Sequence, residues 1–373
     1  MKTAPPKYSA GCPDHCPGCV WPRLDAKTGA AQKYKWLQKR LSLWQDRLEM
    51  IRSVPESMSW GYRDKVCLGV KGEAYSWKIG LRRGDEIIPV PDCPVHTPRV
   101  KESLKTIIKM LPFGKNFPLV YYVQSGALVT LVVKSRSLPD MAWLSGREVS
   151  QKLRNAGITG VWIHMHPSVG KKVFAKKGWH LAWGRPAANT QTGLAHGPTA
   201  FRQVLYGLHE RAITDAETFL APGISDLAID LYSGIGETLA RWTDRDVETI
   251  GVELSGDAVK CACVNAPDAT ILRGACRQRI PQMEDFTAKW MEDRRHGQKL
   301  VYANPPRTGL EPEITDWIAR KLKPDKMAYL SCNAVTLARD LELLEKGGLR
   351  VIRLIPYDFF PHTLHVETLA LLG

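Results

Sequence analysis

The stretch DLAIDLYSGIGETLA, residues 226–240, decides the fold of this chain. An apolar run of strand character ends in a tight glycine turn, and the turn opens into a helix-forming segment. Six further strand-like runs, separated by pieces of helix length, follow at 248–254, 269–274, 299–304, 326–331, 349–356 and 365–372. Alternation of apolar strands with helices is typical of a doubly wound α/β sheet. We therefore predict a Rossmann-like sheet that binds its ligand beyond the carboxyl ends of the strands.

The region before this sheet has a different pattern. Apolar residues recur at helical spacing from about Gln32 to Arg52, which predicts an amphipathic helix. Short β-like runs with two intervening helices follow, at about 98–111 and 146–156, which predicts a β-rich α+β region. The segment RPAANTQTGLAHGPTA, residues 185–200, has the composition of a linker and marks the main boundary.

Composition and charge restrict the class of protein. The 373 residues include 52 Lys and Arg against 38 Asp and Glu, a formal net charge of +14. Such an excess favours a polyanionic partner, nucleic acid first, although a merely basic protein of the cytosol is the alternative. The sequence lacks both the roughly 18 uninterrupted apolar residues of a membrane span and a secretion signal. We therefore expect a cytoplasmic protein without membrane contact.

The glycine turn and the next strand indicate a nucleoside cofactor. Gly234 and Gly236 let the backbone approach a ligand, but Leu239 stands where a dinucleotide fingerprint needs a small residue. S-Adenosylmethionine has no phosphate, and Asp230 would help to hold its cationic end. Glu253 would accept hydrogen bonds from both ribose hydroxyls. The alternative is an ordinary strand-to-helix turn with a solvated acid.

Two later strands also end in polar residues. Asn304 opens the corner NPPR, 304–307, where a carboxamide can meet a base edge or an amino group. Cys332 follows the strand at 326–331 and precedes a helix that would lower the pKa of its thiol. A buried cysteine is as often a small apolar filler. These positions alone therefore leave the role of Cys332 open.

Four segments together resemble the RNA uracil-5 methyltransferases, which make 5-methyluridine in tRNA and 23S ribosomal RNA. The resemblance extends to FRQV, residues 201–204, and to the region 60–95, whereas 97–198 matches only loosely. It implies an N-terminal β-rich region at 1–96, a central RNA-binding insertion at 97–198 and a methyltransferase domain at 199–373. The four segments are DLYSGIG (230–236), NPPR (304–307), SCNAVTLARDL (331–341) and DFFPHTLHVETLALL (358–372).

The resemblance also implies roles for individual residues. Cys332 would be the nucleophile that adds to carbon 6 of uracil, and Glu367 the base that removes the proton from carbon 5. The residues implied to line the S-adenosylmethionine and uracil sites are Gln203, Tyr232, Glu253 and Asn304.

The sequence departs from the family pattern at three positions. Asn304 replaces the usual aspartate and removes a negative charge, which leaves the reaction rate and the hydrogen bonds to uracil in question. Ser233 replaces a cysteine that need not take part in the chemistry. Glu237 stands where the family has a smaller or neutral residue, and it offers a charge that could offset the one lost at 304.

Three cysteines in GCPDHCPGC, Cys12, Cys16 and Cys19, form a soft-ligand cluster near the N-terminus. Both zinc and iron-sulfur centres accept such thiolates. The resemblance implies a [4Fe-4S] cluster with Cys93 as the fourth ligand, and Cys67 is the competing candidate. The spacing is also that of radical S-adenosylmethionine enzymes, but here the triplet precedes any predicted strand.

These observations predict a monomeric, cytoplasmic RNA (uracil-5-)-methyltransferase that uses S-adenosylmethionine and carries a [4Fe-4S] cluster. Its substrate is expected to be 23S ribosomal RNA, because the tRNA-specific bacterial members generally lack the cysteine cluster. Three alternatives stay open at this point: a tRNA enzyme, a non-catalytic RNA-binding or ribosome-assembly protein, and a radical methylase.

Overall fold

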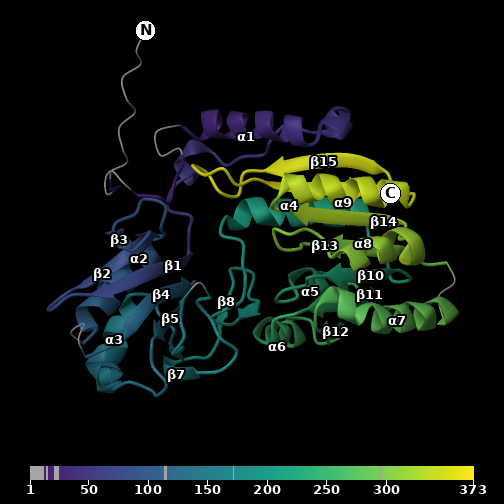
Figure 1. Cartoon of the computed structure of the whole chain (residues 1–373). Coiled ribbons are helices and arrows are strands. Elements are labelled where there is room, and N and C mark those ends of the chain that lie inside the picture. The colour runs from purple at the N-terminus through teal and green to yellow at the C-terminus, as the bar shows by residue number, and fades with distance from the viewer. Residues whose placement is uncertain (1–11, 14–15, 21–24, 113–115, 171, 294–295) are drawn as a thin grey trace, which may run out of the picture. The chain divides into compact units, whose positions relative to one another are not determined.

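The computed structural model describes residues 12–13, 16–20, 25–112, 116–170, 172–293 and 296–373 (Figure 1). The chain divides into two compact units. Unit 1 comprises 1–25 and 56–204, and unit 2 comprises 26–55 and 205–373. Segment 26–55 thus packs with the C-terminal part of the chain, although unit 1 separates the two in sequence.

Unit 2 contains a seven-stranded sheet of order β12-β11-β10-β13-β14-β16-β15. The five strands from β12 to β14 pair in parallel, and β16 pairs antiparallel with both β14 and β15. The predicted Rossmann-like sheet is thereby confirmed. Its strands are β10 (Leu227–Leu231), β11 (Glu248–Glu253), β12 (Thr270–Arg273), β13 (Lys299–Ala303), β14 (Lys326–Ser331), β15 (Val351–Tyr357) and β16 (Glu367–Leu372).

The strand order places helices on both faces of this sheet. Strands β11 and β12 lie on one side of β10, and β13 and β14 lie on its other side. Right-handed crossover connections therefore put the helices of the two halves on opposite faces of the sheet. The helices of unit 2 after residue 205 are α4 (Tyr206–Leu220), α5 (Glu237–Thr243), α6 (Gly256–Asn265), η4 (Cys276–Arg279), α7 (Ile280–Asp293), α8 (Pro312–Trp317), η5 (Ile318–Leu322) and α9 (Ala334–Lys346).

Segment 26–55 lies against this sheet domain. It holds α1 (Ala26–Arg40), which contacts α9, and η1 (Ser42–Arg47), which contacts β15 (Figure 1). Leu37, Leu41 and Trp44 are buried in the same hydrophobic core as the strands of unit 2. The α-helix predicted from about Gln32 begins earlier and stops at Arg40, because a 3-10 turn follows it.

Unit 1 contains a second seven-stranded sheet, of order β3-β2-β1-β4-β5-β6-β7. Strands from both predicted regions, 1–96 and 97–198, belong to this one sheet, which packs its apolar side chains with α2 and α3. Its elements are η2 (Glu56–Met58), β1 (Lys65–Gly72), β2 (Trp77–Arg83), β3 (Glu86–Pro89), α2 (Pro98–Met110), β4 (Leu119–Ser125), β5 (Leu128–Val133), η3 (Ala142–Leu144), α3 (Arg147–Asn155), β6 (Gly160–Met165) and β7 (Trp179–Gly184), followed by the two-stranded pair β8 (Ala188–Asn189) and β9 (Ala195–His196).

Candidate active site

The carboxyl ends of the parallel strands of unit 2 meet at one edge of the sheet. The register pairs Leu231 with Ala303 and Ala303 with Tyr329, so the residues after these strands are neighbours. The strand order reverses between β10 and β13, which is the point at which doubly wound sheets bind ligands. Four predicted site residues lie at this edge: Tyr232 after β10, Glu253 at the end of β11, Asn304 after β13 and Cys332 after β14.

The glycine turn after β10 has a backbone that few residues adopt. Gly234 and Gly236 have φ angles of 57° and 79°, and Tyr232 also has a positive φ of 63°. A non-glycine residue in this region is strained, and such strain gathers at functional sites. Glu253 holds the turn, because its carboxylate accepts hydrogen bonds from the backbone N–H of Gly234 (3.1 Å) and of Ser255 (2.6 Å).

Asp230 lies beneath this turn and is 1% exposed. The Thr238 hydroxyl donates a hydrogen bond to Oδ2, whereas Oδ1 has no hydrogen-bond partner among the described residues. The pKa of Asp230 is raised to about 8, chiefly by burial and to a smaller extent by the nearby carboxylates of Glu253 and Glu237, against the effect of the Thr238 hydrogen bond. A cation at this edge would relieve the repulsion among these acids.

Cys332 and Glu367 come together through the pairing of β14 with β16. These strands are antiparallel, and Ser331 pairs with Thr368. One step beyond Ser331 and one step before Thr368, the same register brings Cys332 and Glu367 opposite each other. Glu367 is 2% exposed and Cys332 is half-buried. The geometry therefore joins the predicted nucleophile and the predicted base.

The pKa of the Cys332 thiol is raised to about 11, contrary to the lowering expected from the following helix. Burial is the largest cause and the Glu367 carboxylate is the second, while Arg307 acts in the opposite direction. A buried thiol beside a carboxylate resists ionisation more strongly than a helix N-terminus promotes it. The thiolate must therefore form against a neighbouring negative charge.

Two residues at this edge were not predicted to have a role. Arg307 lowers the pKa of Cys332, and its Nη2 lies 3.2 Å from Nε2 of His365. Tyr302 is buried in β13, and its pKa is raised by burial and then by Asp230, Glu237 and Glu367. Arg307 belongs to the NPPR motif and could have been chosen from it. Tyr302 looks like any apolar strand residue in the sequence.

Asn304 is half-buried, and its backbone N–H donates to the carbonyl oxygen of Leu231 at 3.3 Å. This bond ties the end of β13 to the end of β10. The loop after Asn304 is held by α9, because Asn333 Nδ2 donates to the Arg307 carbonyl at 3.0 Å and Arg339 donates to the Thr308 carbonyl at 3.1 Å. The corner at Asn304 is thus rigidly placed.

Gln203, the remaining predicted cofactor residue, lies in unit 1. Its side-chain carbonyl oxygen is buried without a hydrogen-bond partner in the part of the chain that the structure describes. The preceding Arg202 forms an ion pair with Asp64 at 2.7 Å, and Lys65 donates to the Ala200 carbonyl at 2.8 Å. Segment 200–203 is thereby fixed to unit 1.

The N-terminal cysteines also lie in unit 1, and all are half-buried. The pKa of Cys19 is raised to about 12, chiefly by burial, with smaller contributions from Cys93, Cys16 and Cys12 and an opposing one from Arg63. The pKa of Cys67 is raised by burial and lowered by Lys65 and Arg82. Among the described residues, no group of three or more His, Cys, Asp or Glu side chains has an arrangement that could hold a metal ion.

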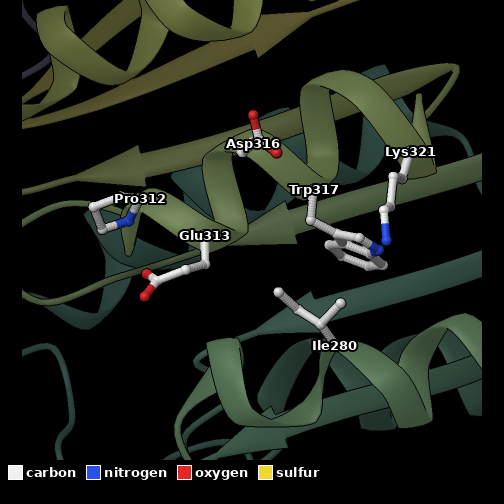
Figure 2. Close-up of a pocket in the computed structure, with 6 residues that line it drawn as sticks. All are labelled: Ile280, Pro312, Glu313, Asp316, Trp317 and Lys321. Carbon is white, nitrogen blue, oxygen red and sulfur yellow. The ribbon is translucent and has the colours of Figure 1, made fainter.

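A groove of about 450 Å³ lies between the start of α7 and the helices α8 and η5. Figure 2 shows the indole of Trp317 pointing toward Ile280, with Lys321 beside it. None of the predicted site residues lines this groove.

The described helices also include none that is long and apolar enough to cross a membrane.

Comparison with known proteins agrees with the motifs. Residues 283–373 match the family model described as tRNA (Uracil-5-)-methyltransferase. The chain is 27% identical to an uncharacterized RNA methyltransferase of Thermosynechococcus vestitus, over 96% of this chain and 82% of the relative. It is 25% identical to the 23S rRNA (uracil(1939)-C(5))-methyltransferase RlmD of an Enterobacter species, over 100% of this chain and 83% of the relative.

A solved structure shows the same fold. The tRNA (uracil-54, C5)-methyltransferase of Pyrococcus abyssi, in complex with S-adenosyl-L-homocysteine, superposes with a TM-score of 0.71 at 22% identity and covers 96% of this chain and 86% of its own. The family model, the similarity along nearly the whole chain and the shared fold agree with the motifs quoted from the sequence. By its C-terminal part and by its similarity along nearly the whole chain, the protein is similar to the RNA uracil-5 methyltransferases.

Proposed function

We propose that this protein methylates carbon 5 of uracil in structured RNA, with S-adenosylmethionine as the methyl donor. The observation that carries the proposal is the pairing of β14 with β16, which brings Cys332 and the buried Glu367 together at the ligand-binding edge. The names of the relatives support the reaction. A non-catalytic RNA-binding protein would have no need for this pair.

The reaction needs a nucleophile because carbon 5 of uracil is itself a poor one. The Cys332 thiolate adds to carbon 6, and the electrons of the 5,6 double bond move to carbon 5 and the adjoining carbonyl. Carbon 5 then takes the methyl group that S-adenosylmethionine supplies. Glu367 removes the proton from carbon 5, the double bond forms again and the sulfur leaves carbon 6 as thiolate.

The residues of unit 2 would hold the methyl donor by charge and by backbone approach. Glu253 would accept hydrogen bonds from the ribose hydroxyls, and Asp230 would face the cationic end. Gly234 and Gly236 would let the backbone lie close to the ligand. The acids near Asp230 already repel one another, which fits a cationic ligand. Tyr232 and Asn304 would complete the cofactor and uracil sites of this unit.

The substrate that we propose is 23S ribosomal RNA. Curated relatives that match the full length of this chain carry that substrate in their names. A tRNA substrate is the second candidate, because the family model and the Pyrococcus abyssi enzyme are named for tRNA. The formal charge of +14 suits either polyanion. A uracil within folded RNA must leave its stack to reach Cys332, at a cost of roughly a few kcal/mol.

We also propose that Cys12, Cys16, Cys19 and Cys93 hold a [4Fe-4S] cluster. The support is chemical: Cys93, Cys16 and Cys12 each act on the ionisation of Cys19, and cysteine thiolates are the ligands that hold iron-sulfur clusters. Cys67 is disfavoured, because the charges acting on it are those of Lys65 and Arg82. Methyl transfer needs no electron, so the cluster would have a structural or RNA-contacting role.

Two measurements test these proposals. Purified protein, S-adenosylmethionine and transcripts of 23S ribosomal RNA or tRNA should yield 5-methyluridine, detected by nucleoside mass spectrometry. Product on tRNA alone would identify tRNA, the second candidate, as the substrate. No product on either RNA would contradict the proposed reaction. Anaerobically purified protein should show the absorption of sulfur-to-iron charge transfer, and a colourless protein would contradict the proposed cluster.

A further inference from the structure

A lysine of the N-terminal helix is buried inside unit 2. Lys33 in α1 is 2% exposed, and its Nζ lies 2.5 Å from Oδ1 of Asp358 and 2.9 Å from the carbonyl oxygen of Phe360. Asp358 is 1% exposed. A buried ammonium is costly unless its partners satisfy it, so this contact fixes one arrangement of the two segments.

The contact falls at the start of the loop that leads to Glu367. Asp358 follows the end of β15, and residues 358–366 connect β15 to Glu367, the first residue of β16. A second bond joins the same loop to the N-terminal segment, because the backbone N–H of Asp358 donates to the Arg52 carbonyl at 2.8 Å. Segment 26–55 therefore holds the loop through both a side chain and its backbone.

The other end of this loop lies at the active site. His365 is within 3.2 Å of Arg307, which acts on Cys332, and Glu367 also acts on Cys332. Inside the loop, the Thr363 hydroxyl donates to the Phe360 carbonyl at 2.8 Å and accepts from the His365 N–H at 3.2 Å. A series of hydrogen bonds thus runs from Lys33 through Phe360 and Thr363 to His365, two residues before Glu367.

We propose that Lys33 is a positioning residue for Glu367. The proposal rests on the function proposed above. In the described contacts Lys33 touches neither Cys332 nor Glu367. It acts by fixing the loop 358–366, which leads to Glu367 and so helps to set the position of its carboxylate. Proton removal from carbon 5 depends on that position, whereas addition of the Cys332 sulfur and methyl transfer do not use the base.

RNA that contains 5-fluorouridine separates these steps. Cys332 can add to carbon 6 of the fluorinated base and carbon 5 can take the methyl group, but Glu367 has no proton to remove, so the covalent adduct persists. The amount of adduct therefore reports the steps before the base. The 5-methyluridine formed in unmodified RNA reports the complete reaction, and adduct trapped on unmodified RNA reports a slow base step.

The full-length variant to test is Lys33→Met combined with Asp358→Asn, because removing both charges avoids an unpaired buried charge. Trp44→Phe is the matched control: Trp44 Nε1 donates to Glu345 Oε2 at 2.9 Å, which ties the same segment to α9 away from the loop. Glu367→Gln serves as the reference for a lost base. Melting temperatures of all variants show whether each one is folded.

The double variant should form adduct with fluorinated 23S ribosomal RNA at no less than the wild-type rate, because a displaced Glu367 does not hinder ionisation of Cys332. Its rate of 5-methyluridine formation should fall by about 10- to 100-fold, the effect of a small misplacement of a catalytic group. Adduct should also accumulate on unmodified RNA, as in Glu367→Gln, and Trp44→Phe should behave as wild type. Equal losses in both assays, or no loss, would overturn the positioning role. Wild-type protein that forms neither adduct nor product would contradict the proposed function, and this inference with it.

Discussion

Cys332 and Glu367 lie opposite each other because β16 runs antiparallel to β14 with Ser331 paired to Thr368. The last strand of the chain thus begins beside the end of a central parallel strand. The Glu367 carboxylate raises the pKa of the Cys332 thiol. The same carboxylate can take a proton from a uracil that is bound to the Cys332 sulfur. Strand pairing sets the register that brings the two residues together.

Replacing the base should stop the reaction after methyl transfer. Glu367→Gln keeps the size of the side chain but cannot accept the carbon 5 proton, and loss of a general base costs about 10²- to 10⁴-fold in rate. We expect a covalent protein–RNA complex that survives denaturing electrophoresis and carries the methyl group. Glu367→Gln combined with Cys332→Ser should form no such complex. A complex that persists without Cys332 would assign the nucleophile elsewhere.

The reactivity of Cys332 toward iodoacetamide should depend on its two charged neighbours. The thiol ionises with a pKa of about 11, so alkylation should rise steadily from pH 7 to pH 10. Glu367→Gln removes the charge that raises this pKa and should speed alkylation at every pH below it. Arg307→Gln should slow alkylation. Peptide mass spectrometry of the Cys332 peptide measures the alkylation rate of both variants. If both substitutions changed that rate in the same direction, the opposed effects of Glu367 and Arg307 on Cys332 would be contradicted.

Binding of the methyl donor should be linked to a proton on Asp230. The pKa of this carboxyl is raised to about 8, so below that pH it is mostly protonated, and the cationic end of S-adenosylmethionine favours its ionised form. Binding should therefore release protons near pH 7 and tighten as the pH rises from 6 to 8. Titration calorimetry in two buffers of different ionisation enthalpy measures the release. Asp230→Asn should abolish it, and an unchanged release in that variant would exclude Asp230 as its source.

Asn304 offers a test of an unusual residue at the site. If the amide only weakens the site, Asn304→Asp should raise the methylation rate, since it restores the carboxylate that the family usually has. Single-turnover formation of 5-methyluridine is the measurement, because it excludes product release. Asn304→Ala provides the control for loss of the side chain. A lower rate for Asn304→Asp than for wild type would show that asparagine has a role of its own.

The sequence alone was sufficient to predict the sheet and the glycine turn at its edge. Apolar runs separated by helix-length pieces predicted β10 to β16, and the glycine turn at Gly234 and Gly236 predicted where backbone and ligand would meet. These features depend on neighbours in sequence. The resemblance added Cys332 and Glu367 as a pair, which spacing alone would not have joined.

Features that depend on distant contacts could not be predicted in this way. The helix after Cys332 indicated a lowered pKa, but burial and then Glu367, which β16 brings beside the thiol, raise it. Lys33 looked like one of many basic residues on a helix, and only its contact with Asp358 buries it. Trp36 follows the apolar spacing of its helix and yet is 38% exposed.

The most direct test of the central claim is the 5-methyluridine content of ribosomal RNA and tRNA in cells. Nucleoside mass spectrometry would compare a strain that lacks this gene, its parent, and the deletion strain complemented with wild-type or Cys332→Ala protein. We predict loss of 5-methyluridine from ribosomal RNA in the deletion strain and its return with wild-type protein but not with Cys332→Ala. Unchanged 5-methyluridine in both RNA fractions of the deletion strain would contradict the account.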